Sequence, residues 1–127
     1  MGPIRVLIVD DQAAPREAMS AVVGVADGFQ VVCAVASGEE SVVAAHDLAP
    51  DLVLMDVNLP GIDGIEATRQ IRSLPSAPVV LLLSTYDEED FDINGCGAAA
   101  YVPKGSFGPV RLHSEWQAAL TGDHTAR

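Results

Sequence analysis

The sequence lacks any apolar run that approaches the ~18 residues needed for a membrane-spanning helix. It also lacks the signs of a signal peptide. The segment from Met1 to Arg5 enters a strand pattern at once, without a charged n-region, an apolar h-region and a cleavage site. We therefore expect a cytoplasmic protein with no membrane partner.

Side chains that form disulfides or bind soft metals are scarce. Cys33 and Cys96 show neither CxxC spacing nor the pattern of a secreted scaffold, so we expect two buried reduced thiols. The histidines, His46, His113 and His124, lie far apart in polar contexts. We expect them to be solvated or interfacial rather than a set of metal ligands.

Basic residues are few. The 127 residues contain 7 Lys and Arg against 18 Asp and Glu, which gives a net charge of −11. Such a surface repels polyanions, so we expect no direct binding of nucleic acid and a better fit to a cation or a basic partner. The length and the hydrophobic fraction of 49% suit one globular domain with its own core.

What the sequence does contain is a regular alternation of short apolar runs and amphipathic stretches. The predicted strands are 5–9, 30–35, 51–56, 79–83 and 98–102. The first predicted helix covers about 14–27, and the second runs from a capping box at Ser37 and Glu40 to about 49. The third turns Ile65, Thr68, Ile71 and Leu74 inward, and a brief fourth helix follows the acidic stretch 87–90. The last helix begins at about 109 and has an apolar face of Leu112, Trp116, Ala119 and Leu120. This alternation predicts a doubly wound α/β domain with a five-stranded parallel sheet and helices on both faces.

Polar side chains stand where four of these strands end. They are Asp10, Asp11, Asp56, Ser84 and Lys104. Taken alone, Asp56 could simply begin a turn, since Asp is common there. In a doubly wound fold, however, the carboxyl ends of parallel strands share one edge, so these five side chains should converge on a ligand site.

Three converging carboxylates repel one another, so either one is protonated or a cation lies among them. An all-oxygen ligand set suits Mg²⁺, which takes one or two carboxylates together with a phosphoryl group. A carboxylate beside such a metal, a lysine and a hydroxyl indicates phosphoryl transfer. Asp56 would supply the attacking oxygen, Lys104 would neutralise charge, and Ser84 would donate a hydrogen bond to the phosphoryl group of the aspartyl phosphate.

Four stretches carry a resemblance to a known family. They are Val9–Asp11 (VDD), Met55–Gly64 (MDVNLPGIDG), Leu83–Tyr86 (LSTY) and Tyr101–Lys104 (YVPK). Over nearly its full length the chain resembles the receiver domain of two-component response regulators, most of all receivers that precede a helix-turn-helix output domain.

The resemblance implies a flavodoxin-like strand order of 2-1-3-4-5 and phosphorylation of Asp56 by a histidine kinase. It implies that Asp11 and Asp56 bind Mg²⁺ directly with the backbone carbonyl of Asn58, and that Asp10 acts through water. It further implies a switch pair of Ser84 and Tyr101, although Tyr101 could also be a plain strand aromatic at the surface.

By the same resemblance, the responding surface combines the helix expected within 87–97, the fifth strand and the last helix. It would form a homodimer or contact an output domain. We expect a receiver domain over 1–122 and a frayed tail, or the start of a linker to an output domain outside this chain, over 123–127. The interval from Ser84 to Lys104 is about two residues shorter than is typical of such receivers, and Gly105 follows the lysine where many have proline.

Three functions remain open at this level. The leading one is a phosphorylation-controlled module with no turnover beyond its own phosphorylation and dephosphorylation. A single-domain relay or an unphosphorylated docking module is the second. A Mg²⁺-dependent phosphohydrolase is the third, although such enzymes usually place a second acid two positions after the nucleophile, where this chain has Asn58.

Overall fold

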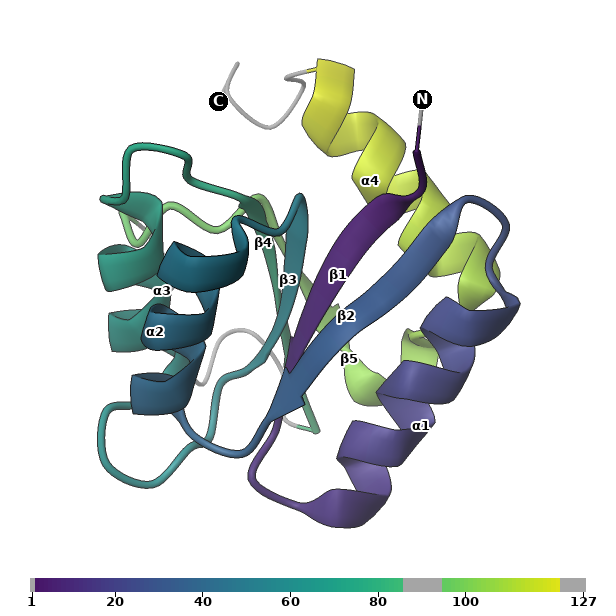
Figure 1. The fold of residues 1–127 in the computed structure, drawn as a ribbon. Helices are drawn as coiled ribbons and strands as arrows, with labels where there is room; N and C mark the ends of the chain where they lie inside the picture. The colour runs from purple at the N-terminus through teal and green to yellow at the C-terminus, as the bar shows by residue number, and fades with distance from the viewer. Residues whose placement is uncertain (1, 86–94, 122–127) are drawn as a thin grey trace.

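The computed structural model describes residues 2–85 and 95–121, and over these residues the chain forms a three-layer α/β domain (Figure 1). The strands are β1 (Ile4–Val9), β2 (Phe29–Val35), β3 (Leu52–Asp56), β4 (Val79–Ser84) and β5 (Ala100–Pro103). They pair in parallel in the order β2-β1-β3-β4-β5. The predicted fold class and strand order are confirmed.

Helices cover both faces of this sheet. They are α1 (Ala13–Val25), α2 (Gly38–Leu48), α3 (Gly64–Arg72) and α4 (Pro109–Thr121), with a short 3₁₀ helix, η2, over Lys104–Ser106. Figure 1 shows α2 and α3 on one face and α1 and α4 on the other. None of the helices in the described part of the chain is long and apolar enough to span a bilayer.

The core is split by the sheet into two halves, and β1 shows why. Val6 and Ile8 pack with α1 and α4 residues, whereas Leu7 and Val9 pack with α2 and α3 residues. All four are fully buried, because successive strand residues point to opposite faces and both faces are covered. This double coverage makes the central strands continuous apolar runs and sets the polar residues at their ends apart.

Side-chain caps begin two of the helices, and the one at Ser37 and Glu40 was predicted. The Ser37 hydroxyl accepts a hydrogen bond from the Glu40 amide at 3.1 Å, and the Glu40 carboxylate accepts one from the Ala36 amide at 3.1 Å. The capping box at the start of α2 is thus confirmed. Asp63 caps α3 in the same manner, accepting from the Glu66 amide at 2.8 Å.

Several boundaries differ from the prediction. Helix α1 ends at Val25 rather than near 27, because Ala26 is extended and Gly28 turns the chain with φ +87°. Strand β5 begins at Ala100 rather than 98, after Gly97 with φ +97°. Leu120 is 58% exposed and does not belong to the apolar face of α4. At about 100° per residue, it lies roughly 80° around the helix from Leu112.

The scarce residues fall partly as expected. Cys96 is buried but Cys33 is only half-buried, so the prediction of two buried thiols is right for Cys96 alone. His46 and His113 are exposed. The short helix predicted after 87–90, Tyr86, His124 and the tail 123–127 lie outside the described residues.

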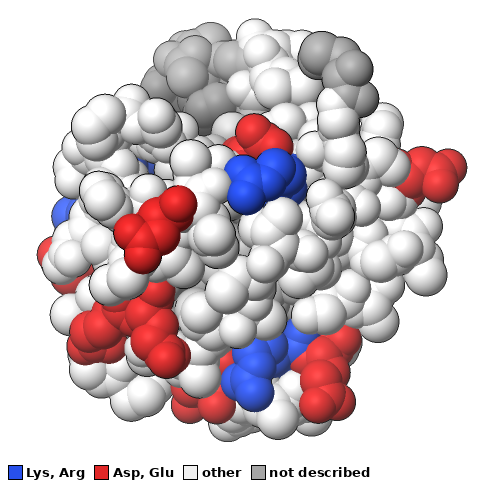
Figure 2. All heavy atoms as spheres, viewed as in Figure 1, with Lys and Arg blue, Asp and Glu red and all other residues white. Residues whose placement is uncertain are grey.

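On the face shown in Figure 2, acidic side chains gather over the side that carries α2 and cover more surface than basic ones.

Candidate functional site

Two acids are buried at the carboxyl edge of the sheet. Asp10 directly follows β1 and is fully buried, and Asp56 ends β3 and is 4% exposed. Because β1 and β3 are neighbours in the sheet, their ends bring the two carboxylates together. The flanking backbone is anchored to the strands on either side, since the Asp10 amide donates to Val35 O at 3.1 Å and the Val57 amide to Leu83 O at 3.0 Å.

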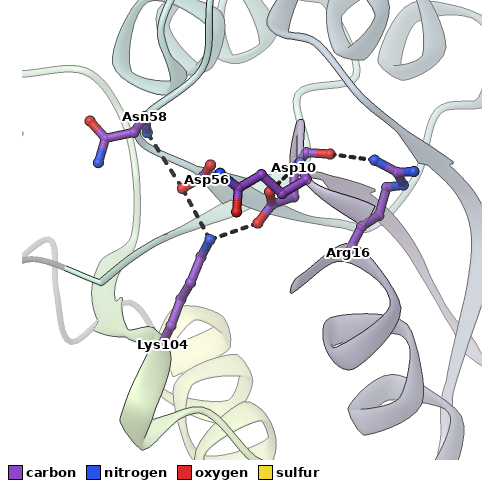
Figure 3. A network of polar contacts seen from close by, with 6 residues as sticks. Asp10, Arg16, Asp56, Asn58 and Lys104 are labelled. Carbon is purple, nitrogen blue, oxygen red and sulfur yellow. Dashed lines mark hydrogen bonds and ion pairs between the residues drawn. The ribbon is translucent and has the colours of Figure 1, made fainter. Parts of the chain in front are cut away.

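Lys104 lies just after β5, the edge strand beyond β4, and its side chain reaches this pair. Its Nζ lies 2.7 Å from Asp10 Oδ2 and 3.4 Å from Asp56 Oδ1, as Figure 3 shows. The contact joins residues 94 positions apart. Lys104 makes it although Gly105, not proline, comes next in the chain. The predicted convergence of Asp10, Asp56 and Lys104 is therefore what the structure shows.

Asp11 completes an acidic cluster. One carboxylate oxygen each from Asp10, Asp11 and Asp56 lie within 4.8 Å of one another, and Asp11 is the exposed member. This donor set consists of hard oxygen ligands with one side open to solvent, which fits Mg²⁺ and suits neither zinc nor copper. Asn58 is exposed nearby, and its backbone amide donates to Asp56 Oδ1 at 3.4 Å.

The electrostatics of the site are unbalanced. Burial and the neighbouring Asp10 charge raise the pKa of Asp56 to about 6, and Lys104 offsets only part of this. Burial by itself would lower the pKa of Lys104, but its hydrogen bond to Asp10 and the two carboxylate charges outweigh that effect and raise it. The lysine therefore stays charged while Asp56 holds its charge at a free-energy cost.

Ser84 lies on β4, the strand next to Asp56, and Tyr101 lies on β5, one strand further away. Ser84 ends β4 and is fully buried. It follows Leu83, the residue that pairs with Asp56, so it stands at the same sheet edge. Tyr101 lies in β5, is 8% exposed and packs in the core half that faces α2 and α3. The alternative of a surface aromatic is wrong, whereas the switch role of Ser84 and Tyr101 stays a prediction.

Gly64 supports the site in a way that the sequence did not reveal. A Cβ at this position would collide with the carbonyl oxygen of Asp56 and lie 2.8 Å from Val57 Cα. The close approach lets the Gly64 amide donate to Val57 O at 2.9 Å, which ties the start of α3 to the end of β3. The sequence shows Gly64 only as the last residue of the stretch Met55–Gly64, because such proximity arises from packing.

Two residues that hold the β1–α1 connection, Gln12 and Arg16, were also missed. The Gln12 amide donates to Asp10 Oδ1 at 2.9 Å. Arg16, in the first turns of α1, donates from Nη1 to the backbone carbonyl of Asp10 at 2.9 Å (Figure 3). Neither residue belongs to a pattern that would separate it from an ordinary helix start.

Comparison with known proteins agrees with this geometry. The family model described as the response regulator receiver domain matches residues 6–116. Response regulator GacA of Pseudomonas viridiflava is 45% identical over 106 residues, which cover 81% of this chain and 49% of that protein. Transcriptional regulatory protein YdfI of Bacillus subtilis is 32% identical over 121 residues, covering 94% and 56%. The chain thus spans about half the length of these relatives.

Solved structures show the same fold. A LuxR-family two-component response regulator from Aurantimonas sp. superposes with a TM-score of 0.83 at 32% identity, covering 95% of this chain and 87% of that one. The signal receiver domain of the putative response regulator NarL from Mycobacterium tuberculosis gives a TM-score of 0.80 at 26% identity, with each chain fully covered. The fold, the acid–lysine edge and these matches together place the chain in the family of response regulator receiver domains.

Proposed function

We propose that this domain accepts a phosphoryl group on Asp56 from a histidine kinase and thereby controls an output. The observation that carries the proposal is the placement of Lys104 Nζ between the carboxylates of Asp10 and Asp56, at 2.7 and 3.4 Å. A buried carboxylate held beside a fixed cation can attack phosphorus while the charge of the approaching phosphoryl oxygens is neutralised.

In the transfer, an Asp56 carboxylate oxygen forms the new O–P bond as the bond from phosphorus to the donor histidine nitrogen breaks. Attack requires the ionised form of Asp56, and a pKa of about 6 leaves most of it ionised at pH 7. Lys104 stays protonated and pairs with the phosphoryl oxygens. Mg²⁺, when bound by Asp11, Asp56 and the Asn58 carbonyl with Asp10 acting through water, supplies further neutralisation of these oxygens.

The readout would begin at Ser84. Its hydroxyl can donate to a phosphoryl oxygen on Asp56, and its displacement would change the space available to Tyr101. Both residues are buried on the paired strands β4 and β5, which supports this coupling. The responding surface would combine the segment 87–97, β5 and α4, and would form a homodimer or hold an output domain.

The boundaries of the module follow the same reasoning. We propose a receiver over 1–122, with 123–127 as a frayed tail or the start of a linker. The relatives of about twice its length, one of them named a transcriptional regulatory protein, support transcription control through an output domain outside this chain. The net charge of −11 supports a receiver that does not bind nucleic acid itself. We propose the cytoplasm as its location.

An apolar hollow next to Lys104 supports a protein as the phosphoryl donor. It lies between α1 and the segment after β5, and is lined by Pro15, Ala18, Met19, Val22, Leu83, Phe107 and Lys104 itself. An apolar helix of a kinase docked there would bring a phosphohistidine near Asp56. Ala18 is exposed in α1, so a bulky substitution there would disturb a docked protein and leave the acids untouched.

The decisive experiment is phosphotransfer. Incubation with a small acyl phosphate and Mg²⁺ should add one base-labile phosphate, detected by intact mass, and chelation of the metal should prevent it. Asp56→Asn should take up no phosphate under the same conditions. Equal labelling of Asp56→Asn would show that the acceptor has been assigned to the wrong residue.

A further inference from the structure

Arg16 is the feature of the site that the proposed chemistry does not use. It is half-buried in α1, and its guanidinium turns back over the β1–α1 connection to donate to the Asp10 carbonyl at 2.9 Å. Because this hydrogen bond goes to a backbone carbonyl and not to a carboxylate, it adds little ion pairing to the acids. It does fix the backbone at the point where β1 ends.

The connection held in this way carries Asp11. Asp10 Oδ2 is held by Lys104 and Asp10 Oδ1 by the Gln12 amide. The Arg16 amide in turn donates to the Gln12 carbonyl at 3.1 Å. Residues 10–12 therefore form a short loop that is tied on both sides, and the backbone of Asp11 lies at its centre.

Asp11 depends on that loop more than Asp10 or Asp56 does. Asp10 and Asp56 are buried, so packing holds their side chains, whereas Asp11 is exposed. Its carboxylate stays within 4.8 Å of the other two because of where its backbone lies. Relaxation of this loop would therefore move the Asp11 carboxylate away from the other two.

We propose that Arg16 is a positioning residue for the metal site. By holding the Asp10 carbonyl, it keeps the Asp11 carboxylate where it can bind Mg²⁺ together with Asp56. This inference rests on the proposed function, since it assigns a role toward the Mg²⁺ that the phosphotransfer uses. Arg16 does not touch the reacting atoms.

The sign of the effect separates this role from plain electrostatics. Loss of a positive charge close to an acidic cluster would by itself strengthen the binding of a cation. Loss of a positioning contact would weaken it, since removal of groups that orient metal ligands typically costs about 10- to 100-fold in affinity. The two explanations therefore predict opposite changes.

The test is Mg²⁺ titration of the unphosphorylated protein, followed by backbone NMR shifts of Asp11 and Asp56. For Arg16→Gln we expect a Kd for Mg²⁺ raised about 10-fold. Arg16→Lys, which keeps the charge and can place one donor near the carbonyl, should raise it about threefold. Arg69→Gln is the matched control, because it removes the same charge from α3, where Arg69 pairs with the exposed Glu66. Its Kd should equal that of the wild type.

An unchanged or lower Kd in Arg16→Gln would overturn the proposal. If thermal unfolding shows that Arg16→Gln is not folded, Arg16→Lys decides alone, and a wild-type Kd in that variant would overturn the proposal as well. Failure of the wild type to bind Mg²⁺ would instead contradict the proposed function, and the role of Arg16 with it. Normal binding of Mg²⁺ by the wild type, together with an unchanged Kd in the Arg16 variants, would contradict only the role of Arg16.

Discussion

The two ends of the sheet use the same kinds of residue with different results. At the amino end, the Arg5 amide donates to Asp51 Oδ2 at 2.9 Å, and Arg5 Nη1 donates to the carbonyls of Leu48 and Ala49 at 2.8 and 2.9 Å. At the carboxyl end, Lys104 faces Asp10 and Asp56. Each end combines at least one carboxylate with a long basic side chain, yet only the carboxyl end resembles a chemical site.

The difference lies in burial and in the balance of charge. At the amino end, Asp51 is exposed and Arg5 meets the negative end of the α2 dipole, so each charge is solvated or compensated. At the carboxyl end, two buried carboxylates share one ammonium group. The excess negative charge there can be relieved by a proton or by a divalent cation, whereas the amino end has no such excess.

Glycines near the two ends give the largest expected contrast. Gly64→Ala forces a Cβ into the Asp56 carbonyl, and overpacking against backbone should cost about 3 kcal/mol of unfolding free energy or more. Gly28→Ala meets no neighbour but must adopt φ +87°, which should cost about 1 kcal/mol. Urea unfolding monitored by circular dichroism measures both. Equal losses of unfolding free energy in the two variants would show that the structure around Gly64 accommodates a methyl group.

The pH dependence of stability should reveal the excess charge. The folded state binds a proton on Asp56 more tightly than the unfolded state does, because the pKa rises from 3.8 to about 6. The unfolding free energy should therefore fall as pH rises from about 4 to 6, by about 2–3 kcal/mol from this residue. The difference in unfolding free energy between wild type and Asp56→Asn, measured against pH, isolates the contribution of Asp56. Saturating Mg²⁺ should reverse the fall in unfolding free energy. A difference that does not vary with pH would contradict the raised pKa.

Removal of the Lys104 ammonium group should increase the imbalance of charge at the carboxyl end of the sheet. In Lys104→Met the attraction that lowers the pKa of Asp56 is lost, so this pKa should rise further above its wild-type value of about 6. Carboxyl ¹³C NMR titration measures it directly. Arg69→Gln serves as the control, since Arg69 pairs with Glu66 on α3. A lower pKa of Asp56 in Lys104→Met would mean that the lysine does not stabilise the carboxylate.

The smallest effect should come from the amino end. Arg5→Gln removes the guanidinium contacts to the last carbonyls of α2, and should cost about 1 kcal/mol of unfolding free energy. The rate of Asp56 phosphorylation from an acyl phosphate should be unchanged, because Arg5 lies at the other end of β1. A slower reaction in a folded Arg5→Gln protein would show that the two ends are coupled.

Much of the site could be predicted from strand ends alone. Asp10, Asp56 and Lys104 follow apolar runs, and parallel strands bring such ends together whatever their separation in the chain. Gly64 and Arg16 could not be assigned in this way. The contact of Gly64 with Asp56 and that of Arg16 with the Asp10 carbonyl depend on how α3 and α1 pack on the sheet, which no local pattern encodes.

The sequence by itself determined the class of fold and the edge at which the polar groups meet, because hydrophobic periodicity and the handedness of crossovers leave few alternatives, whereas the strand order followed from the resemblance to receiver domains. Only the tertiary structure decided which acid is exposed, how the lysine is shared and how the connecting loops are tied. Asp10 and Asp11 are adjacent in sequence, yet one is fully buried and the other exposed. Burial, and with it the cost of holding a charge, is a property of the packed layers.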